Sequence, residues 1–133
     1  MIKIKKSAFS LIELIFAIVI IGIISSFAVP KLMNISSKAK ISTIKQDIHT
    51  IITSIQSYYL INNKIDKISE AVNINESVWV LKDKEVIYKE GENNCIKITI
   101  VENKLNLIIS ESAGNICLEL KNNGVKTISY DLI

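Results

Sequence analysis

Glu13 is the one charged side chain in an apolar run of 21 residues that extends from Phe9 to Val29. A helix of that length, at ~1.5 Å per residue, covers the ~30 Å hydrocarbon core of a bilayer. An ionisable group at membrane depth is costly to insert, and such groups are usually retained for a function. The spacing therefore predicts a membrane-spanning helix in which this carboxylate has a role.

The other reactive side chains form no recognisable catalytic pattern. His49 is the only histidine, and no Ser or Cys accompanies it in a familiar arrangement. The acidic clusters at residues 90–94 and 111–115 lack the Asp-rich spacing of a calcium loop, and we interpret them as polar turns. The sequence also contains no glycine-rich phosphate loop, nucleophile elbow or paired catalytic carboxylates. We therefore predict that the chain is not an enzyme and holds no catalytic residue, cofactor or metal.

Cys95 and Cys117 are the only cysteines. Their spacing fits neither a zinc knuckle nor a redox C-x-x-C motif. In a domain exported to an oxidising compartment, two cysteines on neighbouring strands form one structural disulfide, which stabilises a small core by ~3 kcal/mol. Two free buried thiols are the alternative interpretation.

The charge of the chain is concentrated at its amino terminus. The formal net charge of +3 comes from 16 basic and 13 acidic residues among 133. Without Lys3, Lys5 and Lys6, each sign has 13 residues. All the basic residues are lysines, so no guanidinium is present for bidentate recognition of phosphate or guanine. We therefore predict no specific nucleic-acid binding, and one small domain beside the apolar segment.

Residues 8–14, Ala-Phe-Ser-Leu-Ile-Glu-Leu, follow Lys5-Lys6 and open the apolar run. This arrangement closely resembles the amino terminus of type IV pilins and of the pseudopilins of type II secretion. The resemblance implies a leader of residues 1–8 that a prepilin peptidase removes, with cleavage and N-methylation at Ala8 and Phe9. It also implies that Glu13, the fifth residue of the mature chain, serves filament assembly. Ala8 stands where the family usually has Gly.

The resemblance further implies a location, partners and a function. The subunit would span the inner membrane once, with its carboxyl-terminal domain in the periplasm, and would assemble with homologous pilin or pseudopilin subunits into a filament. A type II secretion pseudopilin or minor pilin fits the short exported domain, and a type IV pilus or DNA-uptake pseudopilus subunit is the alternative within the family. From another class, the alternative is a membrane-anchored or secreted binding domain whose ordinary signal is cut near residues 26–28.

The hydrophobic pattern predicts the helical elements that carry these residues. In the helix of residues 9–30, Gly22 and Pro30 predict flexibility or a kink, because Pro30 lacks a backbone N–H. Beyond Pro30, apolar residues recur every three or four positions, which predicts an amphipathic helix over residues 31–61, continuous with the first. Its apolar stripe consists of Ile41, Ile44, Ile48, Ile51, Ile52, Ile55, Tyr58 and Tyr59.

Alternating apolar and polar residues then predict an antiparallel sheet over residues 77–131. Two hairpins are expected, followed by two further strands on either side of a turn at residues 122–124. The expected strands are residues 78–81, 85–88, 95–101, 105–110, 116–120 and 125–130. Residues 31–133 are therefore expected to form a pilin-like globular domain of the α+β class, with a long helix packed on a small sheet.

Overall fold

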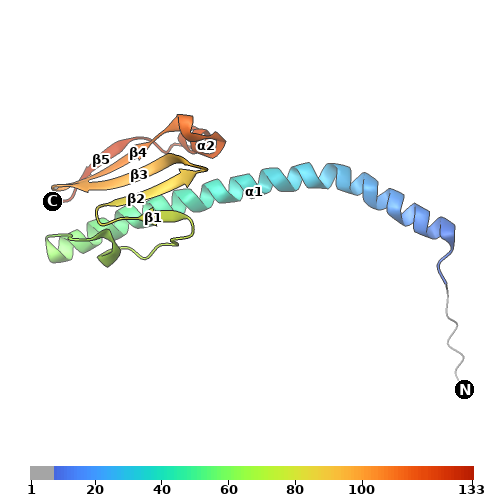
Figure 1. Cartoon of the computed structure of the whole chain (residues 1–133), viewed down its shortest axis with the longest axis horizontal. Helices are drawn as coiled ribbons and strands as arrows, with labels where there is room; N and C mark the ends of the chain where they lie inside the picture. Colours follow the sequence, from blue (N-terminus) through green and yellow to red (C-terminus); the bar gives the residue numbers. More distant parts are fainter. Residues whose placement is uncertain (1–7) are drawn as a thin grey trace, which may run out of the picture. The chain divides into compact units, whose positions relative to one another are not determined.

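The computed structural model describes residues 8–133, which form one long helix followed by an antiparallel sheet (Figure 1). Helix α1 (Leu11–Asn62) has 52 residues. The elements after it are η1 (Ile68–Glu70), β1 (Trp79–Leu81), β2 (Glu85–Glu90), β3 (Asn93–Val101), β4 (Lys104–Ile109), η2 (Glu111–Ala113), α2 (Asn115–Asn122) and β5 (Ile128–Asp131). The chain divides into two compact units, and the boundary follows Lys38, within α1.

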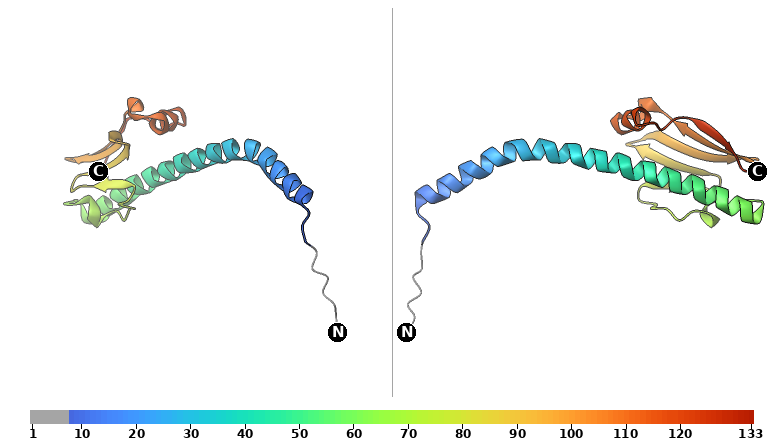
Figure 2. Two further views of the ribbon diagram at one scale, coloured as in Figure 1. Left: turned by 45° about the vertical axis from the view of Figure 1, so that its right-hand side comes forward. Right: turned by 180° about the vertical axis from the view of Figure 1, so that it is seen from behind.

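In the unit that begins at Ala39, α1 lies along one face of the sheet (Figure 2). The five strands follow in the order β1-β2-β3-β4-β5, and every neighbouring pair is antiparallel. The six isoleucines of α1 between Ile41 and Ile55 are at most 8% exposed, and they form one core cluster with alternate residues of the strands. The predicted apolar stripe and the α+β fold class are confirmed.

The strand register places one apolar face of the sheet against α1 and leaves a mixed opposite face, where the buried Ile87 lies beside Lys97. Ile98 of β3 lies between Val86 of β2 and Leu107 of β4, and all three side chains are buried under α1. On the opposite face, Lys97 donates to the Glu85 carboxylate at 3.0 Å, and this hydrogen bond lowers the pKa of Glu85. The alternation that the sequence predicts for a half-buried sheet is therefore present.

Residues 116–120 were predicted to form a strand, and this prediction is wrong because they lie in helix α2. Ile116, Leu118 and Leu120 alternate as in a strand, which explains the error. The buried side chains are instead Cys117 and Leu120, which are three residues apart and therefore share one face of a helix. The sheet consequently has its fifth strand only after α2.

The amino terminus of α2 is capped by a residue that is distant in sequence. The Glu90 carboxylate at the end of β2 accepts hydrogen bonds from the backbone N–H groups of Ile116, at 2.9 Å, and of Cys117, at 3.0 Å. A Ser or Asp at the N-cap position usually supplies such an acceptor, but Gly114 holds that position here. Glu90 therefore takes the place of the missing local cap.

Residues 122–124 end α2, so the predicted turn between two strands is also wrong. Gly124, at φ +98°, donates from its backbone N–H to the carbonyl of Lys121 at 3.1 Å, and Val125 donates to the carbonyl of Leu120 at 3.0 Å. This pair of bonds is a Schellman cap, which requires the left-handed conformation that glycine adopts without strain. The strand expected over residues 125–130 therefore begins only at Ile128.

Gly114→Ala is expected to destabilise the fold by about 1 to 2 kcal/mol, comparable to the loss of a helix cap. A Cβ at this position would lie 2.3 to 2.5 Å from the Glu90 carboxyl atoms, so the carboxylate would have to leave the α2 terminus. Chemical denaturation of the full-length chain in detergent measures the change. Glu90→Ala should lose a similar amount, and the double variant should lose little more. Additive losses would show that Glu90 is not the cap.

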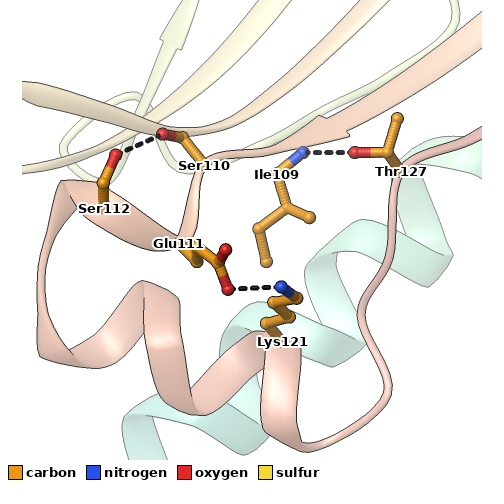
Figure 3. A network of polar contacts seen from close by, with 6 residues as sticks. All are labelled: Ile109, Ser110, Glu111, Ser112, Lys121 and Thr127. Carbon is orange, nitrogen blue, oxygen red and sulfur yellow. Dashed lines mark hydrogen bonds and ion pairs between the residues drawn. The ribbon is translucent and has the colours of Figure 1, made fainter.

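Polar contacts hold the segment between β4 and β5 against the end of β4 (Figure 3). Glu111 of η2 forms an ion pair with Lys121 of α2, and their side chains point toward each other in Figure 3. The backbone N–H of Ile109 donates to the Thr127 hydroxyl at 3.3 Å, and the Ser110 and Ser112 hydroxyls lie 3.2 Å apart. These contacts place α2 beside β3, where one of the cysteines lies.

The structure joins Cys95 of β3 to Cys117 of α2 in a disulfide, with their Cα atoms 5.6 Å apart. Both cysteines are buried, at 1% and 0% exposure. The expected location on two neighbouring strands is wrong, because only Cys95 lies on a strand. The disulfide therefore fastens α2 to the sheet.

Trp79 connects the edge of the sheet to α1, and its side chain is only 1% exposed. Its indole N–H donates to the Asp47 carboxylate of α1 at 3.0 Å. Asp47→Ala would leave this donor without its acceptor, and we expect a loss of about 1 to 3 kcal/mol in the free energy of unfolding. Asp47→Asn keeps an acceptor at the same place and should lose much less. Denaturation of both variants in detergent tests this, and equal losses would contradict the assigned role of the bond.

Candidate functional site

Glu13 lies in the first turn of α1, and Ser10 lies immediately before that helix. The Glu13 carboxylate accepts the backbone N–H of Ser10 at 2.8 Å and the Ser10 hydroxyl at 3.0 Å. In return, the Ser10 hydroxyl accepts the backbone N–H of Glu13 at 3.3 Å. This reciprocal pair is a capping box, with Ser10 at the N-cap and Glu13 three residues later.

The capping box solves a problem that a membrane helix has at its amino terminus. The first backbone N–H groups of a helix have no partner within the helix, and a bilayer offers no water to bind them. Ser10 and Glu13 satisfy two of these groups with side chains from the same turn. Ser10 was not among the predicted site residues, although Ser-x-x-Glu before an apolar run is a capping signal that could have identified it.

An apolar surface surrounds this turn within the unit that ends at Lys38. The exposed fractions are 83% for Phe9, 76% for Leu11 and 62% for Ile12, and exposed apolar side chains continue as far as Ile35. Among residues 8–133, α1 is the one helix that is long and apolar enough to cross a membrane. Such a continuous apolar surface is normally covered by lipid or by other protein chains.

Gly22 and Pro30 both lie within α1, which is helical without interruption from Leu11 to Asn62. A Cβ on Gly22 would meet no atom within 4 Å. Near Pro30, the Ser26 hydroxyl donates to the carbonyl of Ile23 at 2.7 Å. The flexibility assigned to Gly22 and Pro30 from the sequence therefore stays a prediction.

Ala8 and Phe9, at the expected processing position, are exposed and precede α1. The basic leader residues before Ala8 lie outside the part of the chain that the structure describes. A peptidase needs an accessible bond, and the Ala8–Phe9 bond lies one residue before the capping box. Cleavage at this bond stays a prediction.

The remaining candidate residues lie in the unit that begins at Ala39. His49 is exposed on α1, and the described residues contain no group of three or more His, Cys, Asp or Glu side chains that could hold a metal ion. Within the acidic cluster at residues 90–94, Glu90 caps α2 instead of projecting into a loop. This tertiary role of Glu90 had no signal in the sequence, because its partners are 26 and 27 residues away.

Comparisons with known proteins give a motif match at the amino terminus and a similarity to a protein of a secretion system. Residues 3–29 match the prokaryotic N-terminal methylation motif. The chain is also similar to the type II secretion system core protein G of Pseudomonas aeruginosa, with 36% identity over 58 residues, which is 44% of this chain. The aligned residues span about two-fifths of that relative's length, 41%. No solved structure matches the chain at the same stringency.

The methylation motif falls on the segment that contains the capping box and the apolar part of α1. The methylation motif covers Ala8, Phe9 and Glu13, the residues on which the resemblance was based. The fold also has the pilin-like order of a long amino-terminal helix followed by an antiparallel sheet. The chain thus carries a prepilin-type amino terminus, and its resemblance to the pilin and pseudopilin families is confirmed.

Proposed function

We propose that this protein is a structural subunit of a pilin-like filament, made as a membrane-inserted precursor with a leader of residues 1–8. The observation that carries the proposal is the lone carboxylate of Glu13 in the first turn of α1, among exposed apolar side chains and within a segment that matches the methylation motif. An anchor requires only the apolar surface. A subunit that packs against copies of itself also requires a polar group that sets its position.

Cleavage by a prepilin peptidase would create the partner charge for Glu13. In the precursor, the nitrogen of Phe9 is a neutral peptide nitrogen, and after cleavage it becomes an α-ammonium group, which N-methylation leaves positive. In an apolar filament core, this cation and the Glu13 carboxylate of a neighbouring copy attract each other more strongly than in water. Pairing also offsets the desolvation of both groups, so only one axial register of the incoming helix is favourable.

Within this class, we favour a pseudopilin of type II secretion or a minor pilin. The similarity to the core protein G of a type II secretion system supports this choice. A subunit of a type IV pilus or of a DNA-uptake pseudopilus is the second candidate, because the methylation motif is not specific to one machine. The role is structural in each case and requires no catalysis.

We further propose that the chain spans the inner membrane once and carries residues 31–133 in the periplasm. The apolar surface of α1 up to Ile35 supports a membrane location. Lys3, Lys5 and Lys6 of the leader favour a cytoplasmic amino terminus by the positive-inside rule. The disulfide between Cys95 and Cys117 is compatible with an oxidising compartment on the other side.

The mature protein is expected to begin at Phe9 and to carry a methyl group on its α-nitrogen. Peptide mass mapping of the protein purified from its native host tests this, and a strain without the prepilin peptidase should yield a chain that still contains residues 1–8. A mature chain that begins at Val29 would instead indicate an ordinary signal sequence, and it would overturn the filament assignment.

A further inference from the structure

A groove of about 200 Å³ lies between α1 and the edge of the sheet formed by β5, within the unit that begins at Ala39. Its floor is apolar, with buried side chains from α1, from β4 and from the residue Val125 before β5, and with partly buried side chains from β5 itself. The lining residues are Lys45, Ile48, His49, Ile52, Leu107, Gly124, Val125, Lys126, Ile128 and Tyr130. An apolar floor that is open on one side is better covered by a protein segment than left exposed to water.

The rim of this groove is basic. Lys45, His49 and Lys126 line it, and no Asp or Glu is among its lining residues. Lys45 donates to the backbone carbonyl of Asn123 at 3.0 Å, and neither lysine belongs to an ion pair among residues 8–133. The adjacent Asp131 is paired with Lys104 at 3.8 Å. The groove therefore has positive charge that a carboxylate from outside the domain can neutralise.

The groove also adjoins an open sheet edge. Among residues 8–133, strand β5 pairs only with β4, so its other side is an open edge of the sheet. Exposed edges are places where another chain adds hydrogen bonds. A segment that enters the groove beside β5 can thus gain apolar, ionic and backbone contacts together.

The opposite edge of the sheet carries a segment with the complementary chemistry. Residues 74–78 lead into β1, the other edge strand, and combine the exposed carboxylate of Glu76 with the exposed apolar side chain of Val78, whereas Ile74 packs partly against the core. Glu76 belongs to no ion pair in the described part of the chain, and Val78 is 39% exposed. The segment is ordered by Asn75, whose side chain accepts the backbone N–H of Ser77 and whose carbonyl accepts that of Val78, each at 3.0 Å.

We propose that the groove between α1 and β5 binds the segment of residues 74–78 from a second copy of this chain. Glu76 of the incoming copy pairs with Lys126 and Lys45, and the exposed Val78 beside it covers part of the apolar floor. Because the two surfaces lie on opposite edges of one sheet, the contact is head-to-tail, and repetition generates an open filament. This inference rests on the proposed filament function and assigns one of its contacts to the globular unit.

Photocrosslinking in cells that assemble the filament tests this contact. Benzoylphenylalanine replaces Tyr130, an aromatic residue of the groove wall, in the full-length chain. We expect a crosslinked dimer whose tryptic map joins the groove to the peptide of residues 68–82, which contains Glu76. Lys126→Glu should lower the crosslink yield about fivefold or more, since it replaces an attraction with a repulsion. Adding Glu76→Lys to that variant should restore the yield.

Lys40→Glu is the matched control, because it makes the same charge change at an exposed position of α1 that does not line the groove. It should leave the crosslink unchanged. Crosslinks to another protein, or to a different part of the second copy, would overturn the proposal. Normal filaments without a crosslink to residues 68–82 would refute the groove contact and leave the filament function standing. A wild-type chain that forms neither filament nor crosslink would refute both.

Discussion

Glu13→Gln is expected to lower filament yield at least about tenfold while the subunit remains at its normal level in the membrane. Even a modest loss of pairing free energy lowers the equilibrium constant for the addition of each subunit by a factor of that size. Glutamine is also accepted in a capping box, so this substitution removes the charge and keeps the first turn of α1 intact. The yield of sheared filaments, compared with the amount of subunit in the membrane, gives the result.

Ser10→Ala is the complementary variant. It removes the N-cap hydroxyl and leaves the Glu13 carboxylate in place, so it should fray the first turn and decrease filament yield only slightly. If both variants lost assembly equally, the capping geometry and not the charge would be the requirement. If Glu13→Gln assembled normally in a strain with no other pilin-like subunit, Glu13 would have no role in assembly.

Removal of the disulfide is expected to cause the largest loss of stability from a substitution in the globular unit. The bond closes a segment between residues that are 22 positions apart, and the chain-entropy relation gives about 3 kcal/mol for a loop of that size. Cys95→Ala combined with Cys117→Ala should therefore lower the midpoint of chemical denaturation strongly. The wild-type chain with reduced cysteines should unfold at nearly the same midpoint, since it lacks the same constraint.

The covalent state can be measured independently of stability. Alkylation of the native exported protein without a reductant should leave both cysteines unmodified, because they are buried and bonded to each other. Modification of both would show that the bond is absent in the exported protein. A double variant as stable as the wild type would show that polar contacts such as the Glu111–Lys121 pair hold α2 without it.

Local sequence was sufficient to predict the helix and the central strands, and to identify Glu13 as a candidate site residue. The stripe of isoleucines in α1 has helical spacing, and the alternation in β3 has strand spacing, so each periodicity identifies its element without knowledge of the rest of the chain. Glu13 could be identified from the sequence alone, because a single charged residue within a long apolar run is unusual even before the structure is known. Its capping partner Ser10 could have been predicted from the sequence as well, because both residues belong to the same helical turn.

The segment between β4 and β5 could not be predicted in this way. Residues 116–120 have an apolar pattern that suits a strand, and only distant contacts make them helical. The carboxylate of Glu90 reaches the α2 terminus from β2, and the disulfide joins α2 to β3. Where local propensity is weak, the lower energy of such contacts decides between helix and strand.

The groove beside β5 also depends on tertiary structure alone. Lys45 and Lys126 are 81 residues apart in the sequence, and they line one groove only because α1 crosses the sheet beside its last strand. Glu76, at the opposite edge, is likewise unremarkable among the acidic residues of the sequence. The amino-acid sequence determines which side chains share a helix or a strand. The packing of α1 on the sheet determines which of these side chains come into contact, because only packing brings distant residues within the few ångströms over which they interact.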